Sequence, residues 1–132
     1  MSEGETKLEE IKKCREGSFV IIDDEPSVVK DLKISKTGKH GDAKARLEAV
    51  GIFDGQKRVI VSPASHQIKV PIIEKRNAQV LSISNDFAQV MDLEDFSTYE
   101  VKIPEELKDN IKEGREVLIW KFGNKLIIKA LK

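Results

Sequence analysis

The chain has 132 residues, a length that allows one ordinary domain or two very small ones. Charged residues make up 35% and hydrophobic residues 39%, which is typical of a soluble globular protein. Lys plus Arg and Asp plus Glu both number 23, so the zero formal charge excludes a generally basic nucleic-acid coat protein. Because there is no apolar run of membrane length, a polar N-terminus without a signal peptide and a single cysteine, we expect a cytoplasmic protein with no membrane partner.

In the first half, helical periodicity is scarce, and short apolar runs alternate with turn signals. A turn is predicted at Asp24–Ser27, where Pro26 sets φ, and the pair Asp54-Gly55 is a strong hairpin signal. Leu8 and Ile11 could begin a helix or lie on an edge strand, and we favour the strand. The other predicted strands are Phe19–Asp23, Val28–Ile34, Ala45–Phe53, Arg58–Val61 and Gln67–Val70.

The second half begins after Pro71, with Ile72–Asn77 predicted as a linker. Pro104–Lys112 is the best helix candidate, because it has proline and acidic residues at its start and Leu107 and Ile111 on one face. Tight turns are predicted at Asn85-Asp86 and Gly123-Asn124. The strands expected around them are Val80–Ser84, Phe87–Asp92, Tyr99–Ile103, Glu116–Phe122 and Lys125–Ala130.

This order of elements predicts an all-β fold. Three strands, one short helix and two strands in the second half follow the plan of a five-stranded OB-fold barrel. About five strands without an internal helix in the first half suit a small SH3-like barrel. We therefore expect an SH3-like domain over residues 1–71 and an OB-fold domain over residues 72–132.

The segment Ser35–Lys44 (SKTGKHGDAK) stands out because it contains no large apolar residue. From Lys30 to Arg46, five lysines and one arginine face two aspartates, which leaves a local charge of about +4 in a neutral chain. Gly38 and Gly41 bracket Lys39. Because glycine permits positive φ, we expect a tight reversal that exposes the Lys39 side chain.

Several roles are open to a lysine exposed between glycines. A Walker phosphate loop is excluded, because His40 stands where Ser or Thr is needed and Lys33 where Gly is needed. A point-charge contact to RNA phosphate and a chemical modification of Lys39 are both possible, and so is an ordinary solvated turn. The residue pattern taken alone leaves these three open.

A resemblance to a known family narrows the choice. Lys36–Lys44 (KTGKHGDAK) closely resembles the hypusine loop of the translation initiation factor 5A family, whose archaeal and eukaryotic members share the pattern KxGKHGxAK. The compact second half looks most like the archaeal form. The resemblance extends over nearly the whole chain, and further similar segments are Gly17–Ile22 (GSFVII), Gly51–Lys57 (GIFDGQK), Pro63–Pro71 (PASHQIKVP) and Lys75–Asn77 (KRN).

The resemblance implies a ribosome-binding translation factor with the same two barrels. In this family, deoxyhypusine synthase uses NAD to attach an aminobutyl group from spermidine to the lysine that matches Lys39, giving deoxyhypusine. In eukaryotes a hydroxylase then converts deoxyhypusine to hypusine, and the sequence leaves open whether this second step occurs here. The modified side chain reaches the acceptor end of the peptidyl-tRNA and promotes peptide-bond formation at stalling sequences such as proline runs. The implied partners are the ribosome, peptidyl-tRNA and the synthase, and we expect a monomer with no bound cofactor.

The site residues follow from the motif. Thr37, Gly38, His40 and Gly41 match it and are expected to shape the loop for the synthase and tRNA. Lys36 and Lys44 match it too, and their charges suit phosphate contacts; Arg46 is a possible further RNA contact, although its strand could point it either way. Asp42 departs from the pattern, because relatives commonly carry a non-acidic residue there.

Elsewhere the sequence indicates structural roles. No spacing suggests catalytic residues or a metal site, so we expect no enzyme: His66 has no Cys or His nearby, and Cys14 is expected in the core or at an edge. Leu118, Trp120 and Phe122 alternate on one strand face and are predicted to be core, and Asp92–Asp95 is predicted to be a solvated loop. The alternative function is a general RNA-binding module that does not depend on modification.

Overall fold

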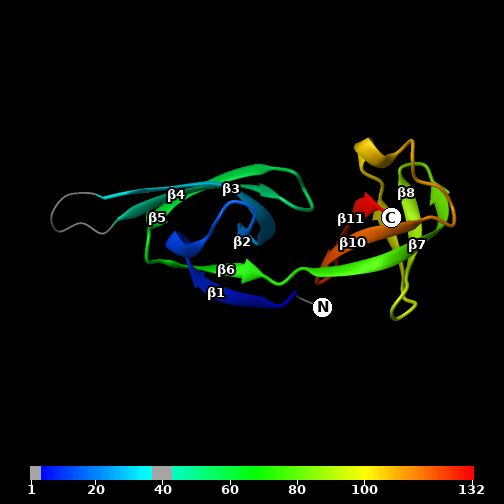
Figure 1. Cartoon of the computed structure of the whole chain (residues 1–132), viewed down its shortest axis with the longest axis horizontal. Coiled ribbons are helices and arrows are strands. Elements are labelled where there is room, and N and C mark those ends of the chain that lie inside the picture. Colours follow the sequence, from blue (N-terminus) through cyan, green and yellow to red (C-terminus); the bar gives the residue numbers. More distant parts are fainter. Residues whose placement is uncertain (1–3, 37–42) are drawn as a thin grey trace. The chain divides into compact units, whose positions relative to one another are not determined.

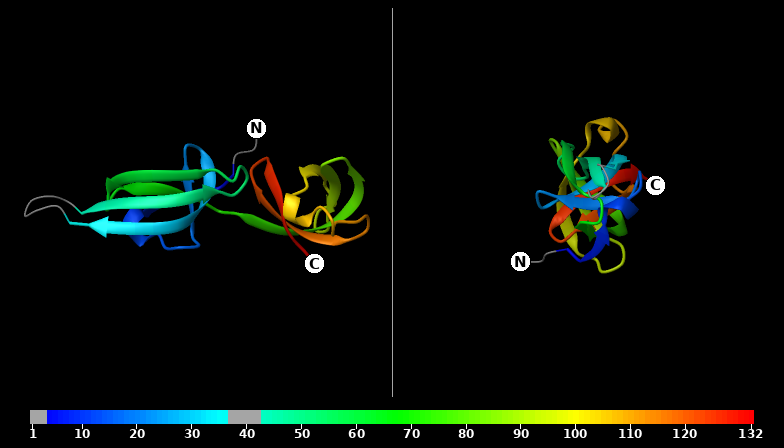
Figure 2. Two further views of the ribbon diagram at one scale, coloured as in Figure 1. Left: turned by 90° about the horizontal axis from the view of Figure 1, so that it is seen from above. Right: turned by 90° about the vertical axis from the view of Figure 1, so that its left-hand side faces the viewer.

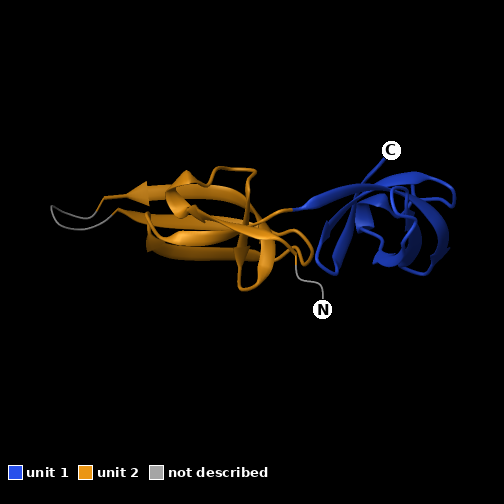
Figure 3. Cartoon of the chain, turned by 90° about the horizontal axis from the view of Figure 1, so that it is seen from below, with its two compact units in different colours: residues 1–3, 73–132 blue, residues 4–72 orange. Residues whose placement is uncertain are grey.

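The computed structural model describes residues 4–36 and 43–132, and strands make up nearly all of the regular structure in them (Figure 1). The only helical segments in these residues are two three-residue 3-10 turns, so the all-β prediction is confirmed. In the same part of the chain, no helix is both long and apolar enough to span a membrane. The chain divides into two compact units, which join between Ile72 and Ile73 (Figure 3).

The first unit is built on an antiparallel sheet in the order β2-β3-β4-β5, with a separate ladder in which β1 pairs with β6. The pairing of β1 confirms the expected N-terminal edge strand for Leu8, whereas Ile11 lies in a 3-10 turn. Its elements are β1 (Thr6–Glu10), the 3-10 turn η1 (Ile11–Lys13), β2 (Phe19–Ile22), β3 (Glu25–Ser35), β4 (Lys44–Gly51), β5 (Lys57–Pro63) and β6 (Gln67–Pro71).

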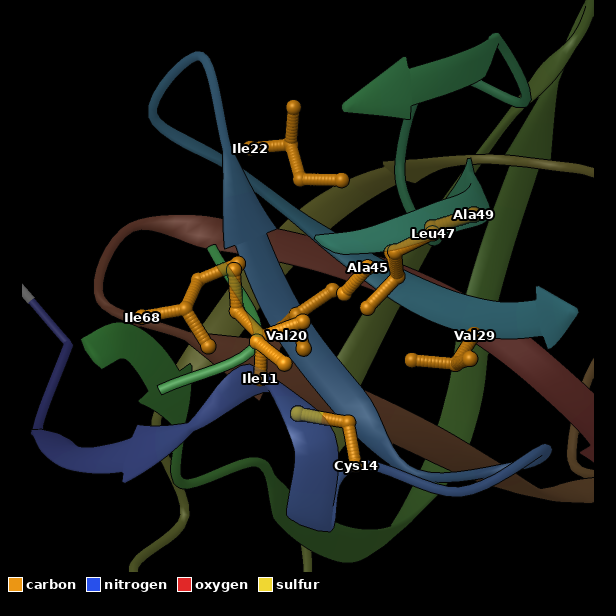
Figure 4. Close-up of a cluster of buried hydrophobic side chains, with 10 residues drawn as sticks. Ile11, Cys14, Val20, Ile22, Val29, Ala45, Leu47, Ala49 and Ile68 are labelled. Carbon is orange, nitrogen blue, oxygen red and sulfur yellow. The ribbon is translucent and has the colours of Figure 1, made fainter. Parts of the chain in front are cut away.

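The core of this unit comes from the alternation of its strands. On β4, Ala45, Leu47 and Ala49 are fully buried, while the residues between them face away from the core. Figure 4 shows these side chains gathered with those of other elements, including Ile11 and Cys14. The prediction that Cys14 is a packed residue is confirmed.

The turn between β2 and β3 differs from the prediction. It lies at Asp23 and Asp24, which both have positive φ (52° and 63°), and β3 already begins at Glu25. A two-residue hairpin turn needs positive φ at both central positions, and aspartate tolerates this conformation. Pro26 and Ser27 therefore lie in the strand, where both are buried.

The second unit has the sheet order β11-β10-β7-β8-β9, and β11 also lies beside β9, which completes a five-stranded barrel arrangement. The predicted linker is wrong from Glu74 onward, because β7 starts there and pairs with β10. The elements are β7 (Glu74–Ser84), β8 (Phe87–Asp92), β9 (Thr98–Lys102), the 3-10 turn η2 (Glu105–Leu107), β10 (Glu116–Phe122) and β11 (Lys125–Leu131).

The predicted helix at Pro104–Lys112 is wrong. Only Glu105–Leu107 forms a 3-10 turn, followed by further turns that bring the buried side chain of Ile111 onto the barrel. The first turn of an α-helix is costly, and Asp109 and Asn110 are weak helix formers. The turns already allow Leu107 and Ile111 to pack against the core, so the segment gains little further burial by forming a complete helix.

The buried face of β10 is the opposite of the predicted one. Val117 and Ile119 are fully buried, whereas Leu118, Trp120 and Phe122 lie on the other face and are half-buried. Both sets alternate and both are apolar, so the sequence pattern could not show which set points into the barrel.

Candidate functional site

The β3–β4 hairpin fixes both ends of the segment that carries the sequence motif. The two strands pair up to the partners Ser35 and Lys44, and β5 continues the sheet on the far side of β4 (Figure 2). The extended run of β3 over 11 residues therefore places the motif beyond the end of the β3–β4 pair, in a four-stranded sheet. Of the predicted site residues, Thr37, Gly38, Lys39, His40, Gly41 and Asp42 lie outside the described residues.

The described basic residues beside the motif form what we call the hairpin base: Lys33, Lys36, Lys44 and Arg46. All four are exposed. Lys33 and Arg46 are register partners, and Lys44 lies two residues before Arg46, so these three share the sheet face opposite the core. The alternation with buried Ala45 and Leu47 settles the orientation of Arg46, which the sequence had left open.

Carboxylates offset part of this charge. Arg46 Nη1 donates a hydrogen bond to Glu48 Oε1 at 2.7 Å, and Lys57 Nζ lies 3.5 Å from Glu48 Oε2. The hydrogen bond from Arg46 holds the pKa of Glu48 below its usual value, so this carboxylate is ionised at neutral pH. Lys33 Nζ is 3.8 Å from Asp31 Oδ2. The positive charge is thus strongest toward Lys36 and Lys44, next to the motif.

Two exposed valines on β5 border the hairpin base and were missed by the sequence analysis. Val61 is 61% exposed and pairs with Arg46, and Val59 is 42% exposed and pairs with Glu48. A run such as Val59–Val61 is typical of a core strand, and its alternation with Arg58 and Ser62 favours burial of the two valines, so no signal in the sequence indicated their exposure. These side chains give the face an apolar margin beside its charges.

In the second unit, the predicted solvated loop at Asp92–Asp95 proves to be anchored. Asp92 is buried, and its Oδ2 accepts a hydrogen bond of 2.8 Å from Arg76 Nε. Glu94 Oε2 and Asp95 Oδ2 lie 3.1 and 3.4 Å from the same guanidinium. The prediction is therefore wrong for Asp92, whose negative charge is compensated inside the barrel, and Arg76 is not available to a ligand.

The remaining titratable candidates show no catalytic arrangement in the described part of the chain. Burial raises the pKa of the Cys14 thiol, which disfavours the nucleophilic thiolate. His66 is exposed. Within residues 4–36 and 43–132, no three His, Cys, Asp or Glu side chains come close enough together to hold a metal ion.

Comparison with known proteins identifies the family. Residues 4–66 match the family model described as "Translation initiation factor 5A-like, N-terminal", and residues 72–132 match "Eukaryotic elongation factor 5A hypusine, DNA-binding OB fold". Translation initiation factor 5A of Methanosarcina mazei is 56% identical over 82% of this chain and 84% of the relative. The chain belongs to the translation initiation factor 5A family. The corresponding protein of Archaeoglobus fulgidus is 52% identical over 83% of the chain and 85% of its own length.

Solved structures of the translation initiation factor 5A family share the fold. The factor 5A from Methanococcus jannaschii has a TM-score of 0.89 at 38% identity and covers 96% of this chain and 95% of its own. A family protein from Naegleria fowleri has a TM-score of 0.78 at 31% identity, covering 96% of this chain and 98% of that one. The fold prediction, with its OB-fold second half, is thereby confirmed, and so is the resemblance to archaeal members.

Proposed function

We propose that the chain is a ribosome-binding translation factor whose Lys39 is modified to hypusine or deoxyhypusine. The modified side chain stabilises the acceptor end of the peptidyl-tRNA and promotes peptide-bond formation at stalling sequences such as proline runs. The observation that carries this proposal is the motif KTGKHGDAK, in a chain of this family, between two strands whose ends are held in register. The remaining motif residues, Thr37, Gly38, His40, Gly41 and Asp42, belong to the same proposal.

The chemistry of the modification suits such a role. The aminobutyl group, when attached, lengthens Lys39 and adds a second amine, which gives a long, thin dication. Such a side chain can reach between RNA backbones where a loop of ordinary residues does not fit. Its contribution is positional, because it holds the tRNA end in a reactive geometry while the ribosome carries out the bond formation. The factor is therefore not itself an enzyme.

The hairpin base supports the same role. Lys36 and Lys44 lie on either side of the motif and are exposed, so their ammonium groups can contact tRNA phosphates. Arg46, on the same face as Lys44, can add a further contact once its bond to Glu48 is exchanged for a phosphate. We expect deoxyhypusine synthase to act on the free factor, and the factor to work as a cytoplasmic monomer.

The decisive experiment is the intact mass of the protein from its native cells, with peptide mapping across Ser35–Arg46. An aminobutyl group on Lys39, with or without one added oxygen, supports the proposal and shows which final form is used. Protein produced in bacteria that lack the synthase is the matched control, and it should carry unmodified lysine.

An unmodified Lys39 in the native protein contradicts the proposal. The alternative, a general RNA-binding module that works without modification, would then be favoured. The two are also separated by Lys39→Arg, which loses its activity in translation if the modified side chain is required and keeps it if only the charge matters.

A further inference from the structure

The outer face of β7, β10 and β11 collects lysines that the function proposed above does not use. These three strands lie side by side in the second unit (Figure 1). Trp120 on β10 pairs with Lys75 on β7, and Phe122 pairs with Lys125 on β11. Lys132 reaches the same face, because its Nζ donates a 2.7 Å hydrogen bond to Asn77 Oδ1. We call this surface the lysine face: Lys75, Lys125, Lys129 and Lys132.

Trp120 organises the centre of the lysine face. Its ring has Lys75 Nζ at 5.0 Å and Lys129 Nζ at 4.6 Å from its centroid. The two ammonium nitrogens are therefore no more than 9.6 Å apart. Lys129 is the extra residue of the register shift between β10 and β11, and this irregularity brings its side chain to the indole. Cation–π contact restricts both side chains, so less conformational freedom is lost when they bind an anion.

The lysine face is positively charged, although the unit that contains it has a negative formal charge. Residues 73–132 contain 10 Lys and Arg and 11 Asp and Glu, so the unit has a formal charge of −1. The lysine face holds four of these cations, whereas Glu116 is the one carboxylate that the described register places on it. The rest of the unit is correspondingly acidic, so within this unit an anionic partner is attracted mainly to the lysine face.

The face that OB-folds generally use for oligonucleotides is different. That face is formed by the second and third strands, here β8 and β9, with the adjoining loops. On it Gln89 pairs with Glu100 and Phe87 with Lys102, so the charges cancel. In the adjoining loop, Asp86 forms an ion pair of 2.9 Å with Lys108. This surface lacks the positive field that a phosphate backbone requires.

We propose that the lysine face binds the phosphate backbone of RNA, and that the β8–β9 face does not. This inference rests on the proposed translation function in one respect, which is the choice of RNA as the polyanion that binds. Lys75 and Lys129 contact phosphate oxygens, and the indole between them keeps them in position. Recognition is independent of sequence, because lysine ammonium groups read charge and not base edges.

The sole tryptophan makes a direct test possible. Trp120 is the only Trp in the chain, so intrinsic tryptophan emission reports on this face and nowhere else. Titrating the unmodified protein of 132 residues with a single-stranded oligoribonucleotide should change the Trp120 emission. The midpoint should coincide with that of the fluorescence anisotropy of a labelled copy of the same RNA. Binding seen by anisotropy with unchanged Trp120 emission would overturn the proposal.

A matched pair of double variants tests the charges. Lys75→Gln/Lys129→Gln should weaken RNA binding about tenfold and lower the slope of log K against log salt by about 1.4, since about 0.7 is lost for each phosphate contact on a single strand. Lys102→Gln/Lys112→Gln removes the same charge from exposed positions elsewhere in the unit and should leave affinity within about twofold of the parent. Equal losses in both variants, or a larger loss in the second, contradict the proposal.

The outcome can be separated from that of the proposed function. The RNA measurements use protein without the modification, and they are repeated with Lys39→Ala so that contacts from the motif do not contribute. The Lys75→Gln/Lys129→Gln protein is also incubated with deoxyhypusine synthase, spermidine and NAD and is expected to be modified as fully as the parent. Loss of RNA binding with full modification assigns the effect to the lysine face, whereas intact RNA binding overturns this inference whatever the state of Lys39.

Discussion

The hairpin base of the first unit and the lysine face of the second both concentrate positive charge in a chain of zero net charge, but their neighbours differ. At the hairpin base, Arg46 is hydrogen-bonded to Glu48, and Lys33 lies near Asp31. On the lysine face, Lys75 and Lys129 are instead held by the Trp120 ring. Each region therefore restrains two of its cations, the first with carboxylates and the second with an aromatic ring.

The difference has a consequence for binding. A cation paired with a carboxylate must exchange that partner when a phosphate arrives, so part of the gain is lost. A cation on an aromatic ring keeps its charge uncompensated. We therefore expect the lysine face to supply general RNA affinity. The hairpin base, where Arg46 and Lys33 lie beside carboxylates, is expected to contribute mainly by orienting the motif that contains Lys39.

The largest effect is expected from Lys39→Arg. Arginine keeps the positive charge but lacks the amine that receives the aminobutyl group, so stimulation of translation through a proline run should fall to the level seen without the factor. The measurement is synthesis of a proline-run reporter in a cell-free system with ribosomes from the native cells, using factor modified beforehand.

The control for this variant is Lys36→Arg, which changes another lysine of the same motif in the same way. It should still be modified and should retain most of its stimulation. Substantial activity of Lys39→Arg would show that charge at this position suffices, and it would remove the functional contrast between the hairpin base and the lysine face.

A smaller effect, on stability, is expected from Asp92→Asn. Arg76 lies between Lys75 and Asn77 on β7, and these two neighbours belong to the outer face. The Arg76 side chain lies on the opposite face, where the buried Asp92 holds its guanidinium. Removing one charge of a buried pair should cost about 2 kcal/mol, less than for a fully enclosed pair because Glu94 and Asp95 remain nearby. Thermal unfolding should show a midpoint lowered by roughly 10 °C.

Glu94→Gln is the matched control, because it alters an exposed carboxylate beside the same guanidinium. Its effect on the unfolding midpoint should be slight. RNA affinity of both variants should equal that of the parent at temperatures where they are folded. A loss of RNA affinity in folded Asp92→Asn would mean that this network also shapes the lysine face.

The smallest effect is expected from Glu48→Gln, which releases Arg46. RNA affinity should rise about twofold at low salt, since one negative charge beside the hairpin base is lost. The pKa of Glu48 is lowered in the folded protein, so its pairing stabilises the fold above the unfolded-state pKa, and this is lost as pH falls through the folded-state value. The difference in melting temperature between parent and variant should therefore shrink in acid.

Glu113→Gln serves as the control for the change in net charge, because it removes an exposed carboxylate from the other unit. It should leave the melting temperature equal to that of the parent both at neutral pH and in acid. An equal rise in RNA affinity in the two variants would show that net charge matters and not the release of Arg46.

Local chemistry determined much of this protein at the level of sequence. Turn residues act over two or three positions, so the hairpins at Asn85-Asp86 and Gly123-Asn124 and the strands Phe87–Asp92 and Glu116–Phe122 were predicted with their observed bounds. The basic motif was equally visible, because charge and glycine spacing need no tertiary contact. The resemblance of Lys36–Lys44 to the hypusine-loop motif then indicated the family.

The tertiary structure decided which face of each strand is buried and which charges are compensated. Val117 and Leu118 look alike in an alternating strand, and only closure of the barrel directs Val117 inward and leaves Trp120 outside. In the same way, only the pairing of β7 with β8 brings Arg76 to Asp92. Contacts between strands far apart in sequence depend on register and closure, and these are properties of the whole sheet.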